Sequence, residues 1–132
     1  MAEQPSHARM TPAERRIVAY TSIAHGLSHA VELVYGTVLV VIAIEFDASL
    51  ALLGAVSNAS ALAYSVMAVP AGQAADRLGS KRVMAVSIGG SGAAAVVVAA
   101  SPNVAVLAVG LVVMGLLGGL YHPAGLSFIT RG

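Results

Sequence analysis

The sequence lacks cysteine entirely and contains few charged or aromatic residues. Without cysteine it can hold no disulfide framework, thiolate metal site or cysteine nucleophile. Only 10% of its 132 residues are charged and 58% are hydrophobic, whereas soluble domains carry about 25% charged residues. The net charge of +1 gives no basic footprint for nucleic acid. This composition excludes a disordered chain and indicates a membrane protein.

Charged residues are confined to a few positions along the chain. No Asp, Glu, Lys or Arg occurs between Asp47 and Asp76, or between Arg82 and Arg131. A membrane helix needs about 20 apolar residues, and too few charged residues remain to cover such segments in a soluble core. We therefore predict an all-α polytopic membrane protein with a cytoplasmic tail over residues 1–14. The four expected spans cover residues 15–45, 49–73, 81–101 and 103–130.

The basic residues predict the orientation. All seven fall on one side of the four spans, and basic residues favour the cytoplasmic side. They are Arg9, Arg15, Arg16, Arg77, Lys81, Arg82 and Arg131. We expect an integral protein of the plasma (inner) membrane with both termini in the cytoplasm. Thr11-Pro12-Ala13-Glu14 matches a capping box with proline at the first helical position, so the first helix should begin before the membrane does.

The segment between the second and third spans has a distinctive order of residues. It runs Gly72-Gln73-Ala74-Ala75-Asp76-Arg77-Leu78-Gly79-Ser80-Lys81-Arg82. Taken as charges alone, this is an ordinary cytoplasmic loop. Gly79 suits a helix end that requires a positive φ.

Polar residues form a stripe within the first span. His25, His29 and Glu32 lie within about 60° of one another on a helix that turns by about 100° per residue. A charged group at mid-bilayer costs roughly 3 kcal/mol, so these groups should face a bundle interior or a wet cavity. They are candidates for a substrate or proton pathway, and the alternative is that they only bond neighbouring helices. Ser57, Ser60 and Tyr64 share a face of the second span and could line the same cavity.

The fourth span contains Tyr121-His122-Pro123-Ala124-Gly125 near its end. Pro123 should bend this helix, and His122 is either a packing residue or a further member of the pathway. The glycines of the last two spans, among them Gly89, Gly90, Gly92, Gly115 and Gly119, predict close helix contacts. Two histidines four apart beside a carboxylate raise the question of zinc, but their order is not H-E-x-x-H, so we expect no metal and no cofactor. No nucleophile–base constellation indicates an enzyme.

The 72–82 segment resembles the signature G-x-x-x-D-R-x-G-x-[RK]-[RK] of the major facilitator superfamily, at the same place between the second and third helices. Together with the helix-1 histidines and Tyr-His-Pro-Ala-Gly, the chain is similar to the fosmidomycin-resistance-type efflux branch over residues 15–132. The resemblance implies a transporter fold of twelve helices, of which these would be the first four. It also implies a role in the cytoplasmic gate for one set of residues: Gly72, Asp76, Arg77, Gly79, Lys81 and Arg82.

The function expected from this resemblance is transport of a small molecule by alternating access, coupled to protons. The partners would be the lipid bilayer, an unidentified substrate, and a missing C-terminal half or a second chain, with no nucleic acid. We expect an N-terminal fragment of a transporter, since the superfamily has two six-helix halves. A truncated product or an oligomerising subunit is the alternative. A further alternative is a small membrane interaction or assembly protein without transport.

Overall fold

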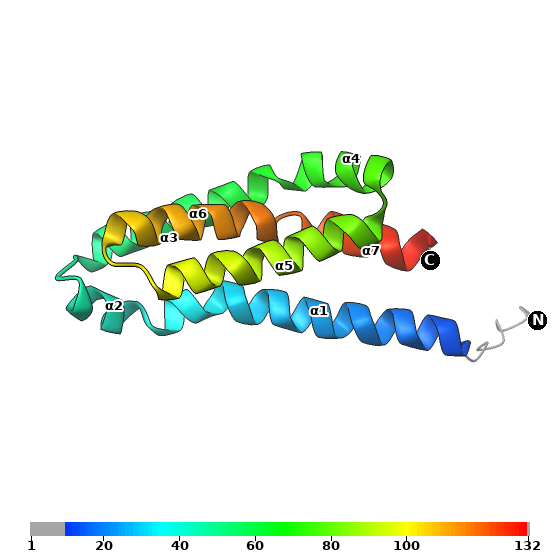
Figure 1. Cartoon of the computed structure of the whole chain (residues 1–132), viewed down its shortest axis with the longest axis horizontal. Coiled ribbons are helices and arrows are strands. Elements are labelled where there is room, and N and C mark those ends of the chain that lie inside the picture. The colour runs from blue at the N-terminus through cyan, green and yellow to red at the C-terminus, as the bar shows by residue number, and fades with distance from the viewer. Residues whose placement is uncertain (1–9, 132) are drawn as a thin grey trace, which may run out of the picture.

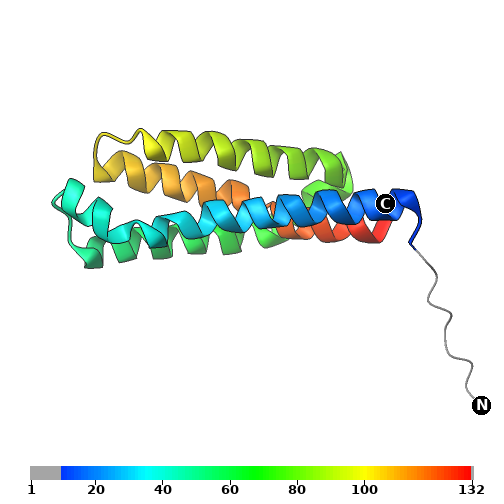
Figure 2. The ribbon, with the colours of Figure 1, turned by 90° about the horizontal axis from the view of Figure 1, so that it is seen from below.

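The computed structural model describes residues 10–131, so the expected tail over residues 1–14, with Arg9, lies largely outside them. The described residues form seven helices: α1 (Pro12–Thr37), α2 (Leu39–Glu45), α3 (Leu50–Val66), α4 (Ala68–Leu78), α5 (Ser80–Ala99), α6 (Val104–Gly118) and α7 (Tyr121–Arg131). They run along one long axis as a bundle, and α1 begins at the end where α7 stops (Figure 1). The α2–α3 and α5–α6 connections lie at the opposite end (Figure 2).

Four stretches of the bundle have the length and composition of membrane spans. Helix α5, with 20 residues, and the combined run Val104–Thr130, with 27 residues, each suffice alone. The other two candidates are bent pairs, α1 with α2 at 50° and α3 with α4 at 41°. The expected all-α class is therefore confirmed, with two spans, or four when each bent pair counts as one.

Side-chain caps explain where several helices begin. Thr11 accepts a hydrogen bond from the Glu14 backbone N–H at 3.2 Å, and the Glu14 carboxylate accepts one from the Thr11 N–H at 2.6 Å. This reciprocal pair is the predicted capping box, and Pro12 opens the helix. Ser49 and Asn103 cap α3 and α6 with a single bond each, because their side chains accept from the backbone N–H three residues further on. Each side chain thus satisfies a backbone donor that a helix N-terminus leaves unpaired.

Two glycines let α6 approach α3 at backbone distance. A Cβ at Gly115 would overlap the carbonyl oxygen of Ser60, and one at Gly119 would overlap that of Tyr64. The Ser60 hydroxyl also donates to the Leu111 carbonyl at 2.7 Å. The expected role of Gly115 and Gly119 in close helix contact is confirmed.

The glycines of α5 were also expected to allow close helix contacts, and most of them do not. A Cβ at Gly90 would meet the flexible end of Leu117 at 3.0 Å, whereas nothing lies within 4 Å of one at Gly89 or Gly92. The expected close contact is therefore wrong for Gly89 and Gly92, because these positions face open space within the described chain.

The break between α6 and α7 comes before Pro123, the residue from which the sequence predicts a bend. The turn falls at Gly119–Leu120, and Pro123 lies in the first turn of α7. Proline has no N–H to donate to the carbonyl four residues earlier, which here belongs to Gly119. The helix is interrupted one turn before Pro123, where a bend was expected, and Val104–Thr130 still counts as one candidate span.

Helix α1 is tied to the bundle by buried tyrosines. The Tyr35 hydroxyl donates to the Leu53 carbonyl of α3 at 3.0 Å. The Tyr121 hydroxyl of α7 donates to the Thr21 carbonyl of α1 at 2.7 Å. Tyr121 is only 3% exposed and packs with Val83 and Ala124. These bonds fix α1 against segments that lie far away in the sequence.

Removal of the Tyr121 hydroxyl should loosen the α1–α7 contact. We expect Tyr121→Phe to lower the free energy of unfolding by about 1 kcal/mol, because a buried hydrogen bond is lost without a change in shape. Thermal unfolding in detergent, followed by circular dichroism, measures the change. The control is Tyr20→Phe, since Tyr20 is 69% exposed. Equal effects of the two substitutions would contradict this role of Tyr121.

Candidate functional site

A cavity of about 460 Å³ lies between the helices of the bundle. Its walls come from α1, α3, α5 and α6, so all four candidate spans contribute to it. Sites that enclose small ligands have volumes of about 300–1,000 Å³. The cavity is therefore large enough for a small molecule.

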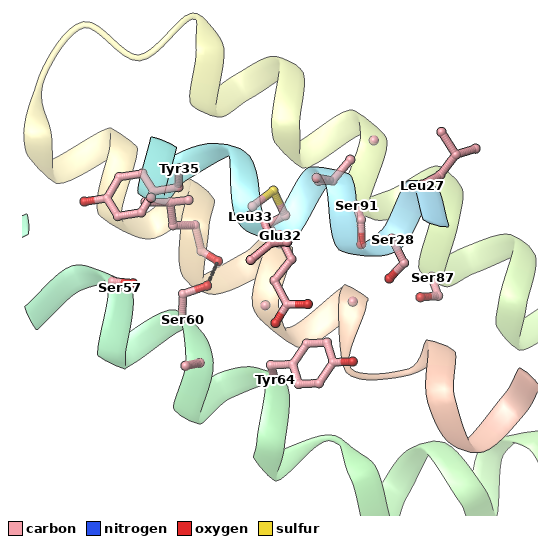
Figure 3. Close-up of a pocket in the computed structure, with 18 of the residues that line it drawn as sticks. Leu27, Ser28, Glu32, Leu33, Tyr35, Ser57, Ser60, Tyr64, Ser87 and Ser91 are labelled. Carbon is pink, nitrogen blue, oxygen red and sulfur yellow. Dashed lines mark hydrogen bonds between the residues drawn. The ribbon is translucent and has the colours of Figure 1, made fainter. Parts of the chain in front are cut away.

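Most of the cavity wall is apolar, and its polar groups come from several helices. They are Ser28, Glu32 and Tyr35 of α1, Ser57, Ser60 and Tyr64 of α3, and Ser87 and Ser91 of α5. Figure 3 shows Glu32 extending from α1 toward Tyr64. The Ser91 hydroxyl oxygen is buried and lacks a hydrogen-bond partner among the described residues. A mostly apolar wall with a few polar groups is typical of a ligand site.

Glu32 connects the cavity to a group of histidines. Its carboxylate lies 3.3 Å from Nδ1 of His29, and both side chains are a little under half exposed. The His29 ring lies 4.5 Å from that of His25, measured between centroids. The predicted stripe on α1 therefore exists as a set of side chains in mutual contact.

His122 of α7 completes this group from a distant part of the sequence. Its ring centroid lies 5.2 Å from that of His25 and 5.5 Å from that of His29. It also lies 6.0 Å from the ring of Tyr64, which lines the cavity. The three histidines thus sit next to the cavity, and of the four expected pathway residues Glu32 is the one in its wall.

The sequence identified part of this wall. Ser57, Ser60 and Tyr64 line the cavity, as their shared helical face predicts. Ser28, Ser87 and Ser91 were missed. A signal was present, because Ser28 precedes Glu32 by four residues and Ser87 precedes Ser91 by four, which places each pair on one helical face.

The expected gate residues surround the junction of α4 and α5. Gly72, Asp76 and Arg77 lie on α4, and Lys81 and Arg82 lie in the first turn of α5. Gly79 alone separates the helices, with φ of 88°, which confirms its predicted conformation. The interpretation of residues 72–82 as a loop is therefore wrong. The helix continues to Leu78 because Ala71 and Ala75 bury one face of α4.

Contacts hold this junction against α7. The Ser80 hydroxyl donates to the Ser127 hydroxyl at 3.0 Å, and Nζ of Lys81 lies 5.6 Å from the centre of the Phe128 ring. Asp76 and Arg77 remain exposed. Lys81 and Arg82 stand at a helix N-terminus, where cations are unfavourable. The helix dipole therefore does not account for the position of these two residues.

The fold and the cavity together define a polytopic helical membrane protein with a mostly apolar cavity among its candidate spans, into whose wall a few polar side chains are set. Comparison with known families identifies it further. A family model described as Major Facilitator Superfamily matches residues 21–131. The chain belongs to this superfamily, whose members are transporters. No curated protein and no solved structure gives a significant match.

Proposed function

We propose that this chain is the N-terminal part of a proton-coupled secondary transporter that moves a small molecule by alternating access. One observation carries the proposal: a carboxylate, Glu32, stands among serines and Tyr64 in a cavity lined by all four candidate spans. An ionisable group at this depth costs roughly 3 kcal/mol in lipid, so it is retained where it faces water or protein. A cavity of about 460 Å³ provides that setting.

Coupling to protons is supported by the groups beside Glu32. His29 lies within 3.3 Å of the carboxylate, and His25 and His122 continue the group. Histidine exchanges a proton near neutral pH. A relay of Glu32 and these histidines would bind a proton on one side of the membrane and release it on the other.

Further helices complete the compartment in this proposal. His25, His122 and Glu32 are exposed in the described bundle, and lipid would not tolerate them. A C-terminal half or a second chain would cover this side, as in superfamily members built from two six-helix halves. Asp76 and Arg77 are exposed at the α4–α5 junction and would contact that half as part of the cytoplasmic gate.

The orientation and direction of transport belong to the same proposal. Arg15, Arg77 and Lys81 lie at the end of the bundle where α1 begins and α5 starts. Glu45 and Asp47 lie at the other end, next to the α2–α3 connection. Under the positive-inside rule the basic end faces the cytoplasm of a plasma (inner) membrane. Resemblance to the fosmidomycin-resistance-type branch supports export.

The test is a substrate-panel transport assay on the complete protein in vesicles, with a variant that fills the cavity. Gly36 lines the cavity, and a Cβ there meets nothing within 4 Å. We expect Gly36→Leu to reduce transport at least about tenfold while the helix gains about 1 kcal/mol from the loss of glycine.

Gly26→Leu is the matched control for this variant. Gly26 is on the same helix with the same free space but does not line the cavity, so transport should persist. If no member of the panel is moved by the wild type, or if both variants transport normally, the proposal fails. A chain that binds partners without any transport would be the interaction protein.

A further inference from the structure

We propose that His25, His29 and His122 form a binding site for a divalent transition-metal ion of the class of Zn²⁺, Co²⁺ and Ni²⁺. One ring nitrogen of each histidine lies within 4.8 Å of the others. We call these residues the tri-histidine cluster. The proposal rests on the transport function above only for the use of the ion as cargo, because the binding itself follows from the geometry.

The spacing of the rings matches a metal site before it closes on an ion. Imidazole nitrogens bind zinc at about 2.0–2.1 Å, which sets them about 3.4 Å apart in a tetrahedral site. The nitrogens of the cluster, within 4.8 Å of one another, need to approach by up to about 1.4 Å, a movement that side-chain rotation supplies. The ring centroids, 4.5 to 5.5 Å apart, already have the separation of three rings directed at one centre.

A hydrogen bond from a side chain to the backbone holds together the two helices that contribute the histidines. The bond from the Tyr121 hydroxyl to the Thr21 carbonyl is 2.7 Å long and buried. Thr21 precedes His25 by one helical turn, and Tyr121 precedes His122 directly. The same bond therefore fixes the separation of the two histidine-bearing segments. A preformed arrangement lowers the cost of ordering ligands when an ion binds.

Glu32 occupies the place of a supporting carboxylate. Metal-binding histidines commonly bond a carboxylate through the second ring nitrogen, which fixes the tautomer and raises the basicity of the ligand. Glu32 lies 3.3 Å from Nδ1 of His29 and so leaves Nε2 for the ion. Three imidazoles favour zinc, cobalt, nickel or copper over magnesium and calcium, which prefer oxygen ligands.

The site has room for a fourth ligand. His25 and His122 are exposed, and the cluster adjoins the cavity that Glu32 and Tyr64 line. Three protein ligands with an open position hold an ion that remains accessible to water or to a small chelating molecule. The arrangement thus suits an ion that binds and leaves.

The test is titration of the full-length protein in detergent with Co²⁺, followed by visible absorption, with Zn²⁺ as competitor. We expect one ion per chain, displaced by Zn²⁺ and not by Mg²⁺. His25→Ala and His122→Ala should each weaken binding at least about tenfold, and Glu32→Gln about tenfold. His7→Ala, at the histidine outside the described residues, is the matched control and should bind as the wild type does.

Two results would overturn the proposal: absence of the cobalt spectrum in the wild type, or its persistence in the His25→Ala, His122→Ala double variant. Should the variants fail to fold, the wild type alone decides. Zn²⁺ must then protect the tri-histidine cluster, but not His7, from diethyl pyrocarbonate, as mapped by mass spectrometry; equal modification with and without Zn²⁺ refutes the site. Because neither assay requires transport, transport of other substrates without metal binding would reject this inference alone.

Discussion

Gly115→Val is expected to lower the free energy of unfolding by about 3 kcal/mol or more, the upper range for overpacked positions. Even one Cβ at this position overlaps the Ser60 carbonyl, and valine adds two further methyl groups. Backbone cannot rotate away as a side chain can, so α3 and α6 must separate. Their separation also breaks the 2.7 Å bond from the Ser60 hydroxyl to the Leu111 carbonyl.

A pair of alanine substitutions isolates this effect from helix propensity. Gly115→Ala should destabilise, whereas Gly89→Ala should stabilise by up to about 1 kcal/mol, because glycine disfavours helices and Gly89 faces open space. Thermal unfolding and monodispersity in detergent measure both. A Gly115→Ala protein as stable as Gly89→Ala would contradict the backbone contact between α3 and α6.

The second large effect concerns energy coupling. In vesicles of the complete protein with an imposed pH gradient, the Glu32→Gln, His29→Ala double variant should lose gradient-driven transport down to the level of protein-free vesicles. The amide and the methyl group cannot exchange a proton, and the 3.3 Å contact between the two side chains disappears. Exchange of substrate down its own gradient should remain, because the cavity keeps its shape.

Glu45→Gln provides the control for this double variant. Glu45 ends α2, at the opposite end of the bundle from the α4–α5 junction, and its replacement should leave coupling intact. Retained coupling in the double variant would reject Glu32 and His29 as proton carriers. The measurement is the rate of substrate transport as a function of the imposed pH gradient, at equal substrate concentrations on the two sides of the membrane.

The helices could be predicted because their signals are local. Long uncharged runs predict membrane spans, and the capping box at Thr11 and the positive φ at Gly79 follow from short motifs. The bends after Thr37 and Val66 had local signals that were not used: Gly36 lies beside the first break, and Pro70 cannot donate to the Val66 carbonyl at the second. The continuation of α4 through the gate segment depends on burial of Ala71 and Ala75 against other helices.

The candidate site was predictable on α1 and only partly beyond it. His25, His29 and Glu32 share a helical face, which spacing alone reveals. The position of His122 beside them depends on the contact between α1 and α7, which a buried bond across a long stretch of sequence maintains. Periodicity describes one helix at a time, and therefore no pattern in the sequence joins His122 to His25. Gly89 was misjudged for the same reason, since only its neighbours show that its surroundings are open.

The unequal attachment of the helices has a mechanical consequence. The backbones of α3 and α6 are in contact at Gly115 and Gly119, so we expect these two helices to move together as one rigid unit. Helix α1 is held by two hydrogen bonds, from the hydroxyls of Tyr35 and Tyr121, and we expect it to move about these two contacts. Such a movement of α1 would change the width of the cavity beside Glu32 without moving α3 relative to α6.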